Sequence, residues 1–448
     1  MISLARLRDT KLFAGCLLAV LVIADFACAQ TSRPRSATAL ANLPTPRAVN
    51  EARARAAGIR KLTGKHLVVY TDLKSSPEVD DLPAIFDLAV PQWAEYFGIN
   101  EEQTRNWQAQ GFLIGNREPF EALGLMPVGN DEFPNGISVG REFWLHAQPS
   151  DYYQRHLMLH EGTHVFMLSF LGACGPGWYM EGTAELFGTH RYDERYKQLS
   201  LRTMPRNREE VPMWGRIKLI HNFTSQRSQP LAAVLEIDNR RQMGDEQYAW
   251  AWAATKFLDS HPRYRTRFRK LQNNVTAPDF NDRFRQMYRG QWAEMQAEWL
   301  AFIAALDYGY DFERMAIDFR RGKPLTKPVR VDIAADRGWQ SSGVRLEAGK
   351  SYRITAKGRY EIANEGEPWP CEPGGVTIDY HDGRPLGVLL GAIDSAKHGT
   401  TLANPIEIGL GTTITPAAAG TLYLRVNDSP SKLDDNRGTL TATISPAG

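Results

Sequence analysis

The character of the sequence changes near residues 322–328, and this change limits the folds that the chain can adopt. Before it, apolar residues recur at helical spacing, for example over residues 291–306. After it, short alternating runs such as residues 422–426 are separated by Gly, Pro and Asp, a pattern typical of a β-sandwich. A chain of 448 residues also exceeds the roughly 250–300 residues of a single core. We therefore expect an α+β domain over residues 65–322, mostly helical, followed by an all-β sandwich over residues 329–448.

Local patterns predict the elements of both parts. A β-branched run indicates a buried strand, and apolar residues three or four positions apart indicate helices. In the first part, we expect a strand over residues 66–71 and helices over residues 86–97, 152–168, 246–259 and 291–306. In the second part, we expect strands near residues 376–379, 386–390, 422–426 and 440–444, with a turn at Asp382-Gly383.

Residues 1–29 have the three parts of a secretory signal peptide. A basic start precedes an apolar run over residues 12–24, and Ala27-Cys28-Ala29 has the small residues of a cleavage site. The apolar run is shorter than the roughly 20 residues of a spanning helix, so we expect no membrane span after cleavage. The protein is then secreted, periplasmic or held at the cell surface. Residues 30–64, which contain several prolines, are expected to form an irregular linker or lead-in.

Cleavage would leave two cysteines, Cys174 and Cys371. An exported protein can form a disulfide between them, but the sequence does not give the distance between their Cα atoms. A disulfide and two free buried thiols are both consistent with the sequence.

Charge excludes one class of partner. The chain has 53 Lys and Arg against 51 Asp and Glu, a formal net charge of +2. A protein that binds the phosphates of nucleic acid usually carries a strong excess of basic residues. We therefore expect no nucleic-acid partner.

The segment with the most chemical information is His160-Glu161-Gly162-Thr163-His164, an H-E-x-x-H motif inside a helical pattern. Residues at i and i+4 lie on the same face of a helix, so both imidazoles can reach one metal ion. Glu161 would lie beside the metal, where it can act as a general base.

A third ligand is expected in the segment that follows, Gly177 to Leu186. A catalytic zinc takes three protein ligands and keeps an open position. Glu181 can be that ligand, and Glu185, one turn later, can then accept a hydrogen bond from the far nitrogen of a ligating histidine. The competing assignment exchanges the two glutamates.

At these residues the chain resembles the gluzincin metallopeptidases, and more broadly the peptidase-MA-like domains of secreted bacterial proteins. The segment from Met180 to Glu185 is similar to their N-E-G-x-A signature, whose glutamate binds zinc. The resemblance implies a zincin-like fold, zinc bound by His160, His164 and Glu181, and hydrolysis of peptide bonds in peptide or protein substrates. The aminopeptidases of this clan carry a G-x-M-E-N segment upstream that binds the substrate amino terminus. Residues 135–140 differ from it, which argues against exopeptidase action.

The mechanism requires a donor for the oxyanion that forms during hydrolysis. Tyr248, on a helical segment after the metal motifs, is our prediction, with Tyr179 and Tyr192 as alternatives. His156 and His190 flank the motifs without the spacing of ligands, so we expect them at the surface or behind the ligands.

The loop from Asn427 to Gly438 contains a second cluster of oxygen ligands. Calcium takes six to eight oxygens, although turns also favour Asn, Asp, Ser and Gly. The loop is similar to the N-D-x-P-x(4)-N-N-x-G loop of the PA-IL-like galactophilic lectins, small β-sandwiches that bind sugar through calcium. Residue by residue, this resemblance implies calcium ligands at Asp428, Asp435 and Asn436 and at the backbone carbonyl of Lys432, with Tyr360 as a further backbone ligand.

The sequence thus predicts a secreted zinc metallopeptidase whose C-terminal sandwich binds glycans or glycoproteins through calcium. The alternative is an inactive peptidase-like scaffold that serves as a secreted carbohydrate-binding protein.

Overall fold

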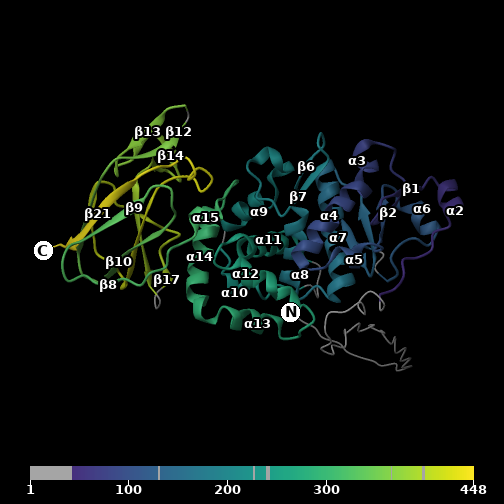
Figure 1. Cartoon of the computed structure of the whole chain (residues 1–448), viewed down its shortest axis with the longest axis horizontal. Helices are drawn as coiled ribbons and strands as arrows, with labels where there is room; N and C mark the ends of the chain where they lie inside the picture. The colour runs from purple at the N-terminus through teal and green to yellow at the C-terminus, as the bar shows by residue number, and fades with distance from the viewer. Residues whose placement is uncertain are drawn as a thin grey trace, which may run out of the picture.

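The computed structural model describes residues 43–129, 132–225, 228–238, 243–364, 366–395 and 399–447. The predicted signal peptide, residues 1–29, and the start of the predicted lead-in lie outside these residues. Figure 1 shows a helical part with a mixed sheet at its far end, followed by a part made of strands. The order of elements agrees with the expected α+β part followed by a β part.

A five-stranded sheet opens the first part, in the order β1-β2-β3-β5-β4. Its strands are β1 (Arg60–Thr63), β2 (Leu67–Thr71), β3 (Ala109–Ile114), β5 (Glu142–His146) and β4 (Gly136–Val139). The central strands β2, β3 and β5 are parallel, and the edge strands β1 and β4 are antiparallel to their neighbours. Every residue of β2 is buried, which agrees with the strand expected from its β-branched run.

The expected lead-in over residues 30–64 is not irregular throughout. Helix α2 (Glu51–Ala56) and strand β1 are both regular, and Ala54 and Ile59 are buried against the sheet. Arg47 joins this region to β5, because its Nε donates to Glu142 Oε1 at 3.1 Å. The absence of proline after Pro46, together with the apolar residues there, was the signal that the prediction overlooked.

The first part contains five longer helices among its described residues, and four of them match the expected ranges. They are α4 (Leu82–Phe97), α7 (Asp151–Leu171), α8 (Gly177–Gly188), α11 (Asp245–Ser260) and α14 (Trp292–Ala305). Helix α7 begins after Ser150, whose hydroxyl accepts from the Tyr153 amide at 3.3 Å, and ends at Gly172 with φ 80°. The aromatic face of α14 is core, since Met295, Trp299 and Phe302 are buried.

Shorter elements complete the first part. The helices are α3 (Pro77–Asp80), α5 (Glu101–Thr104), α6 (Arg117–Ala122), α9 (Gly215–Thr224), α10 (Leu231–Val234), α12 (Arg265–Phe268), α13 (Phe280–Met287) and α15 (Phe312–Met315). Short 3₁₀ turns cover Arg208–Glu210, Pro212–Trp214, Arg269–Asn274 and Arg289–Gln291, and β6 (His190–Asp193) pairs with β7 (Gln198–Leu201).

The second part contains two sheets over one core. The first has the order β17-β16-β20-β10-β8, with β18 beside β16, and the second has the order β19-β11-β21-β9. Leu422 and Leu424 of the first sheet and Ile354 and Ile444 of the second belong to the same buried cluster. Two sheets that share a core form a sandwich, as the alternating runs predicted.

The strands of this part are β8 (Lys323–Pro324), β9 (Val329–Ala334), β10 (Gln340–Leu346), β11 (Tyr352–Lys357), β12 (Tyr360–Asn364), β13 (Pro368–Cys371), β14 (Val376–His381), β15 (Arg384–Leu386), β16 (Leu389–Ser395), β17 (Gly399–Thr400), β18 (Ile406–Glu407), β19 (Gly411–Ile414), β20 (Gly420–Val426) and β21 (Thr439–Pro446). The expected turn joins β14 to β15, and Asp382 and Gly383 both have positive φ, at 49° and 72°.

The two parts meet along α14. Ala297 and Ala301 of this helix pack with Trp339, Leu390 and Tyr423 in one buried cluster. Figure 1 shows α14 and α15 between the helices and the sandwich.

Cys174 and Cys371 are both buried and free, so the alternative of two free thiols is the one found here. They lie in different hydrophobic cores. Across the described part of the chain, no helix has the length and apolar character needed to cross a membrane.

Candidate metal centre

Two histidines of α7 and one glutamate of α8 meet at the buried contact between these helices. His160 and His164 lie one turn apart, and their Nε2 atoms are 3.2 Å from each other. The Glu181 Oε2 atom lies 3.2 Å from Nε2 of His160 and 3.4 Å from Nε2 of His164. All three side chains are buried, and among the described residues no hydrogen bond reaches Glu181 Oε2. These three residues form a group that could hold a metal ion.

Glu185 lies on the opposite side of the His160 ring. Its Oε1 is 3.2 Å from His160 Nδ1, whereas Glu181 faces Nε2. Arg216 donates from Nε to Glu185 Oε2 at 2.6 Å and from Nη2 to Oε1 at 2.7 Å. Burial disfavours the charged carboxylate, but the Arg216 guanidinium holds the pKa of Glu185 well below its ordinary value. The geometry therefore favours Glu181 as the ligand and Glu185 as the residue that orients His160.

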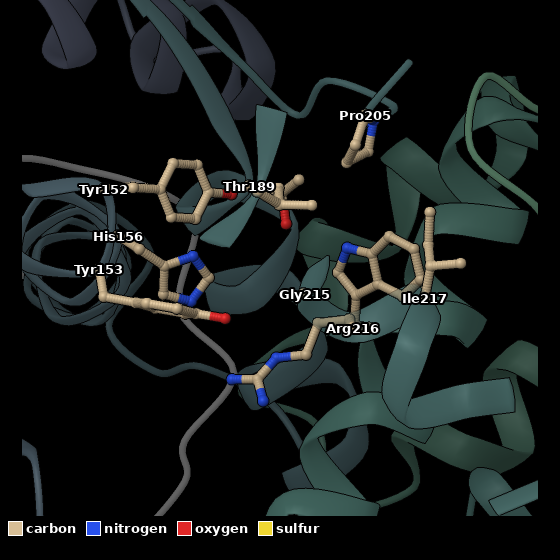
Figure 2. Close-up of a pocket in the computed structure, with 10 residues that line it drawn as sticks. Tyr152, Tyr153, His156, Thr189, Pro205, Gly215, Arg216 and Ile217 are labelled. Atoms are coloured by element: carbon tan, nitrogen blue, oxygen red, sulfur yellow. The ribbon is translucent and has the colours of Figure 1, made fainter. Parts of the chain in front are cut away.

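A second group with suitable spacing consists of His156, His160 and Glu185. The His156 Nε2 atom is 3.3 Å from Glu185 Oε2. Figure 2 shows Arg216 near His156 and Tyr153 at the pocket that these residues line. A guanidinium that already binds both oxygens of Glu185 would repel a cation placed there. The group of His160, His164 and Glu181 is therefore the stronger candidate.

The two flanking histidines are both buried, so of the two places expected for them, the surface and a position behind the ligands, the surface is excluded. His156 packs behind the cluster through its contact with Glu185. His190 lies at the start of β6, where its Nδ1 is 2.7 Å from the Gly188 carbonyl oxygen and its ring stacks on Tyr152 at 4.7 Å. Burial lowers the pKa of His190 to about 3. The strand pair β6-β7 covers this end of α7, which the helical pattern alone did not predict.

Two glycines within the motifs allow the helices to approach closely. A Cβ atom added at Gly162 would lie 2.6 Å from Cε2 of Phe86 on α4. One added at Gly182 would lie 2.5 Å from the carbonyl oxygen of Ala251 on α11. Both sites therefore require a residue without a side chain. Glycine inside a helical pattern was the available signal, but the sequence did not show what it packs against.

The side chain of Glu161, on α7, lies against the edge strand β4. A Cβ atom at Gly136 would come within 2.8 Å of Glu161 Oε1, so this glycine leaves the space that the carboxylate occupies. Burial raises the pKa of Glu161, and the nearby His160 and His164 oppose that rise. A buried carboxyl group with a raised pKa is suited to take up and release a proton. No pattern in the sequence indicates that Gly136 contacts Glu161.

Of the three tyrosines considered as oxyanion donors, Tyr248 lies next to the histidines. Its ring centroid is 6.0 Å from that of His160, and the Arg216 guanidinium carbon lies 5.8 Å from the same tyrosine ring. Burial raises the pKa of Tyr248, so its hydroxyl keeps its proton. Tyr179 instead packs in the aromatic core against Phe280 at 4.9 Å. The Tyr192 ring lies 5.4 Å from the Arg155 guanidinium carbon.

In the sandwich, the loop after β20 brings two of the expected calcium ligands together. Asn436 Nδ2 donates to Asp428 Oδ2 at 2.9 Å, and both side chains are buried. Burial raises the pKa of Asp428 to about 6, and the nearby Asp435 adds to that rise. Lys432 is exposed, and its carbonyl oxygen accepts from the Asp435 amide at 3.5 Å.

Tyr360, the expected backbone ligand, lies beside this loop. Its neighbour Glu361 exchanges two backbone hydrogen bonds with Arg437, at 2.9 and 3.0 Å. A Cβ atom at Gly438 would lie 3.5 Å from the Tyr360 Cα atom. The structure thus places Tyr360 beside Gly438, at the end of this loop.

Comparison with known proteins gives little further information. No family model matches the chain, and no curated protein matches it. One solved structure, "EclA N-terminal domain; PllA-like lectin", is 20% identical and covers 26% of this chain and 95% of its own, with a TM-score of 0.21. A likeness of this size is too weak to support an inference about fold or function.

Proposed function

We propose that the chain is a zinc-dependent metallopeptidase with a zincin-like helical part, exported by its N-terminal segment. The observation that carries the proposal is the convergence of His160, His164 and Glu181 on one buried point, with Glu161 beside them. Two imidazoles and one carboxylate are a common ligand set of catalytic zinc.

The distances within the cluster support zinc rather than calcium or magnesium. Tetrahedral zinc with bonds of about 2.0–2.1 Å separates its ligand atoms by about 3.3–3.4 Å. The separations here are 3.2, 3.2 and 3.4 Å. Calcium and magnesium prefer oxygen ligands alone, which two imidazoles do not provide.

A zinc ion held by this cluster would supply a Lewis acid and lower the pKa of a water molecule. Glu161 accepts the proton of the attacking water and passes it to the leaving amine. Glu185, held by Arg216, fixes the orientation of His160. Tyr248 donates its hydroxyl proton in a hydrogen bond to the oxyanion. Peptide-bond hydrolysis is the reaction that this set of groups supports best.

The proposal is tested by measuring casein hydrolysis by the purified full chain. We expect a chelator to remove the activity and added zinc to restore it, because these ligands bind zinc reversibly. A chain that binds zinc but hydrolyses neither casein nor a broad peptide library would instead favour an inactive scaffold.

The close contact between Gly136 and Glu161 predicts that a side chain at residue 136 will move the Glu161 carboxylate. In Gly136→Ala, the new Cβ atom would displace the Glu161 carboxylate, which lies 2.8 Å from its position. We expect kcat to fall by about tenfold to a hundredfold with zinc content unchanged. Gly290→Ala is the matched control, since an added Cβ there meets nothing within 4 Å. Equal activity of both variants would show that Glu161 is not held by this contact.

We also propose that the sandwich binds glycans through a calcium ion at the loop of Asp428 and Asn436. Buried, closely placed oxygens support this assignment, since Asn436 Oδ1 has no hydrogen-bond partner among the described residues. Asp435 and the Lys432 carbonyl would add ligands from the same loop.

Calcium should therefore raise the melting temperature of the sandwich. At a calcium concentration about 100 times Kd, the expected stabilisation is about 2.7 kcal/mol. Asp428→Ala should abolish the shift measured by calorimetry. Asp434→Ala, at an exposed residue of the same loop, should keep it. A calcium effect that survives Asp428→Ala would exclude this site.

A further inference from the structure

A cavity of about 300 Å³ lies at the junction of the two parts; it contains no residue of the metal centre and adjoins the start of the loop from Asn427 to Gly438. Helix α14 forms one wall and the β16-β20 face of the sandwich forms another. It is lined mainly by small or polar residues: Ala301, Ala304, Ala305, Trp339, Asp382, Arg384, Leu390, Leu402, Ala403, Asn404, Pro405, Arg425 and Asn427. Cavities of this size accept small organic ligands.

Arg425 is the residue that most needs a partner. It is only 6% exposed, and its Nε atom has no hydrogen-bond partner among the described residues. The carboxylates of Asp382 and Asp428 attract its charge. Its nearest ring contact is Trp339, whose centroid lies 5.4 Å from the guanidinium carbon. A buried guanidinium group whose hydrogen bonds are not all made is costly, so a further partner in the cavity would stabilise it.

Other groups of the cavity are suited to a polar, negatively charged ligand. Arg384 is held at the wall by a hydrogen bond from Nη2 to the Pro405 carbonyl at 3.2 Å. Asn427 is 1% exposed, and its Oδ1 has no partner among the described residues. Two guanidinium groups line the cavity against one carboxylate, that of Asp382, which also lies 3.4 Å from His381 Nε2.

Small side chains on helix α14 leave room for the cavity. Ala301, Ala304 and Ala305 are spaced i, i+3 and i+4, so they share one face of α14. Larger side chains on this face would extend into the cavity. Ala304 is exposed, so a larger residue there is tolerated by the core.

We infer that this cavity binds a small hydroxylated anion, the size of an acidic monosaccharide, whose carboxylate or phosphate group pairs with Arg425 and Arg384. The amides of Asn404 and Asn427 and the carboxylate of Asp382 would bind its hydroxyl groups. This site contains no residue of the metal centre. It shares Asn427 with the start of the loop from Asn427 to Gly438, but it needs no calcium ion.

The test is calorimetric titration of the full chain with D-glucuronate, D-glucose 6-phosphate and neutral D-glucose, with EDTA present to remove calcium. We expect at least one anion to bind and glucose to bind at least tenfold more weakly, because a charged hydrogen bond contributes this much. Binding of glucuronate alone assigns a carboxylate ligand, and binding of glucose 6-phosphate alone assigns a phosphate ligand. Binding of neither anion, or equal binding of glucose, would overturn the inference.

Variants locate the binding. Arg425→Met should lower anion affinity at least tenfold, and Arg384→Gln provides the same test at a less buried residue if Arg425→Met does not fold. Ala304→Leu should block the cavity without changing its charge. Arg353→Met, at an exposed residue of β11 on the other sheet, should leave affinity unchanged. Affinity that is unchanged in both Ala304→Leu and Arg384→Gln would place the anion elsewhere.

Discussion

Glu161→Gln is expected to lower casein hydrolysis by about 10²–10⁴-fold, because a positioned general base contributes about this factor. Glutamine keeps the shape of the side chain between α7 and β4 but has no carboxylate to accept a proton. The three proposed zinc ligands are untouched, so zinc content should stay that of the unmodified chain. Initial rates and zinc analysis of the same preparation measure both quantities.

Two comparisons make this prediction specific. Glu118→Gln, at an exposed position of α6, should keep full activity. Activity close to normal in Glu161→Gln would mean that another group accepts the proton, and loss of zinc in the same variant would mean that Glu161 is a ligand. Either result would contradict the proposed mechanism.

The second large effect is expected at Arg216, which binds both oxygens of the buried Glu185. Arg216→Met keeps most of the side-chain volume but leaves a carboxylate that is 1% exposed without its strongest partner. Removing one member of a buried ion pair costs about 3–5 kcal/mol of unfolding free energy. Urea unfolding followed by tryptophan fluorescence measures this loss.

Arg206→Met is the matched control for Arg216→Met. Arg206 pairs with Glu210 at 2.9 Å, but its side chain is 65% exposed, so the expected loss is below about 1 kcal/mol. Arg216→Met combined with Glu185→Gln should recover part of the stability, because the buried charge is then removed as well. Equal losses in Arg216→Met and Arg206→Met would show that the Glu185 contact is not a buried ion pair.

Local sequence patterns predicted four of the five longer helices and several of the strands, and the motifs predicted the residues of the candidate metal cluster. His160 and His164 are four residues apart on one helix, so helical geometry alone places them on one face. Glu181 and Glu185 lie on a second helix close in sequence. The packing of the two helices decides which glutamate faces the histidines as a ligand and which lies behind His160. The sequence allowed either assignment.

Contacts between distant segments could not be predicted in this way. Arg216 is 31 residues from Glu185 in sequence, and nothing around Arg216 marks it as a partner of a buried carboxylate. The contact of Gly136 with Glu161 and the burial of His190 against Tyr152 of α7 also depend on tertiary packing. The cavity beside Arg425 arises only where α14 meets the sandwich, so neither part alone contains it.

The most direct test of the account is the zinc content of the full chain after dialysis, measured by mass spectrometry of the metal. We predict about one zinc ion per chain, retained in Glu161→Gln and lost in His164→Ala and Glu181→Ala. An unmodified chain without bound zinc after incubation with the metal, or undiminished zinc in both His164→Ala and Glu181→Ala, would contradict the proposed metal centre.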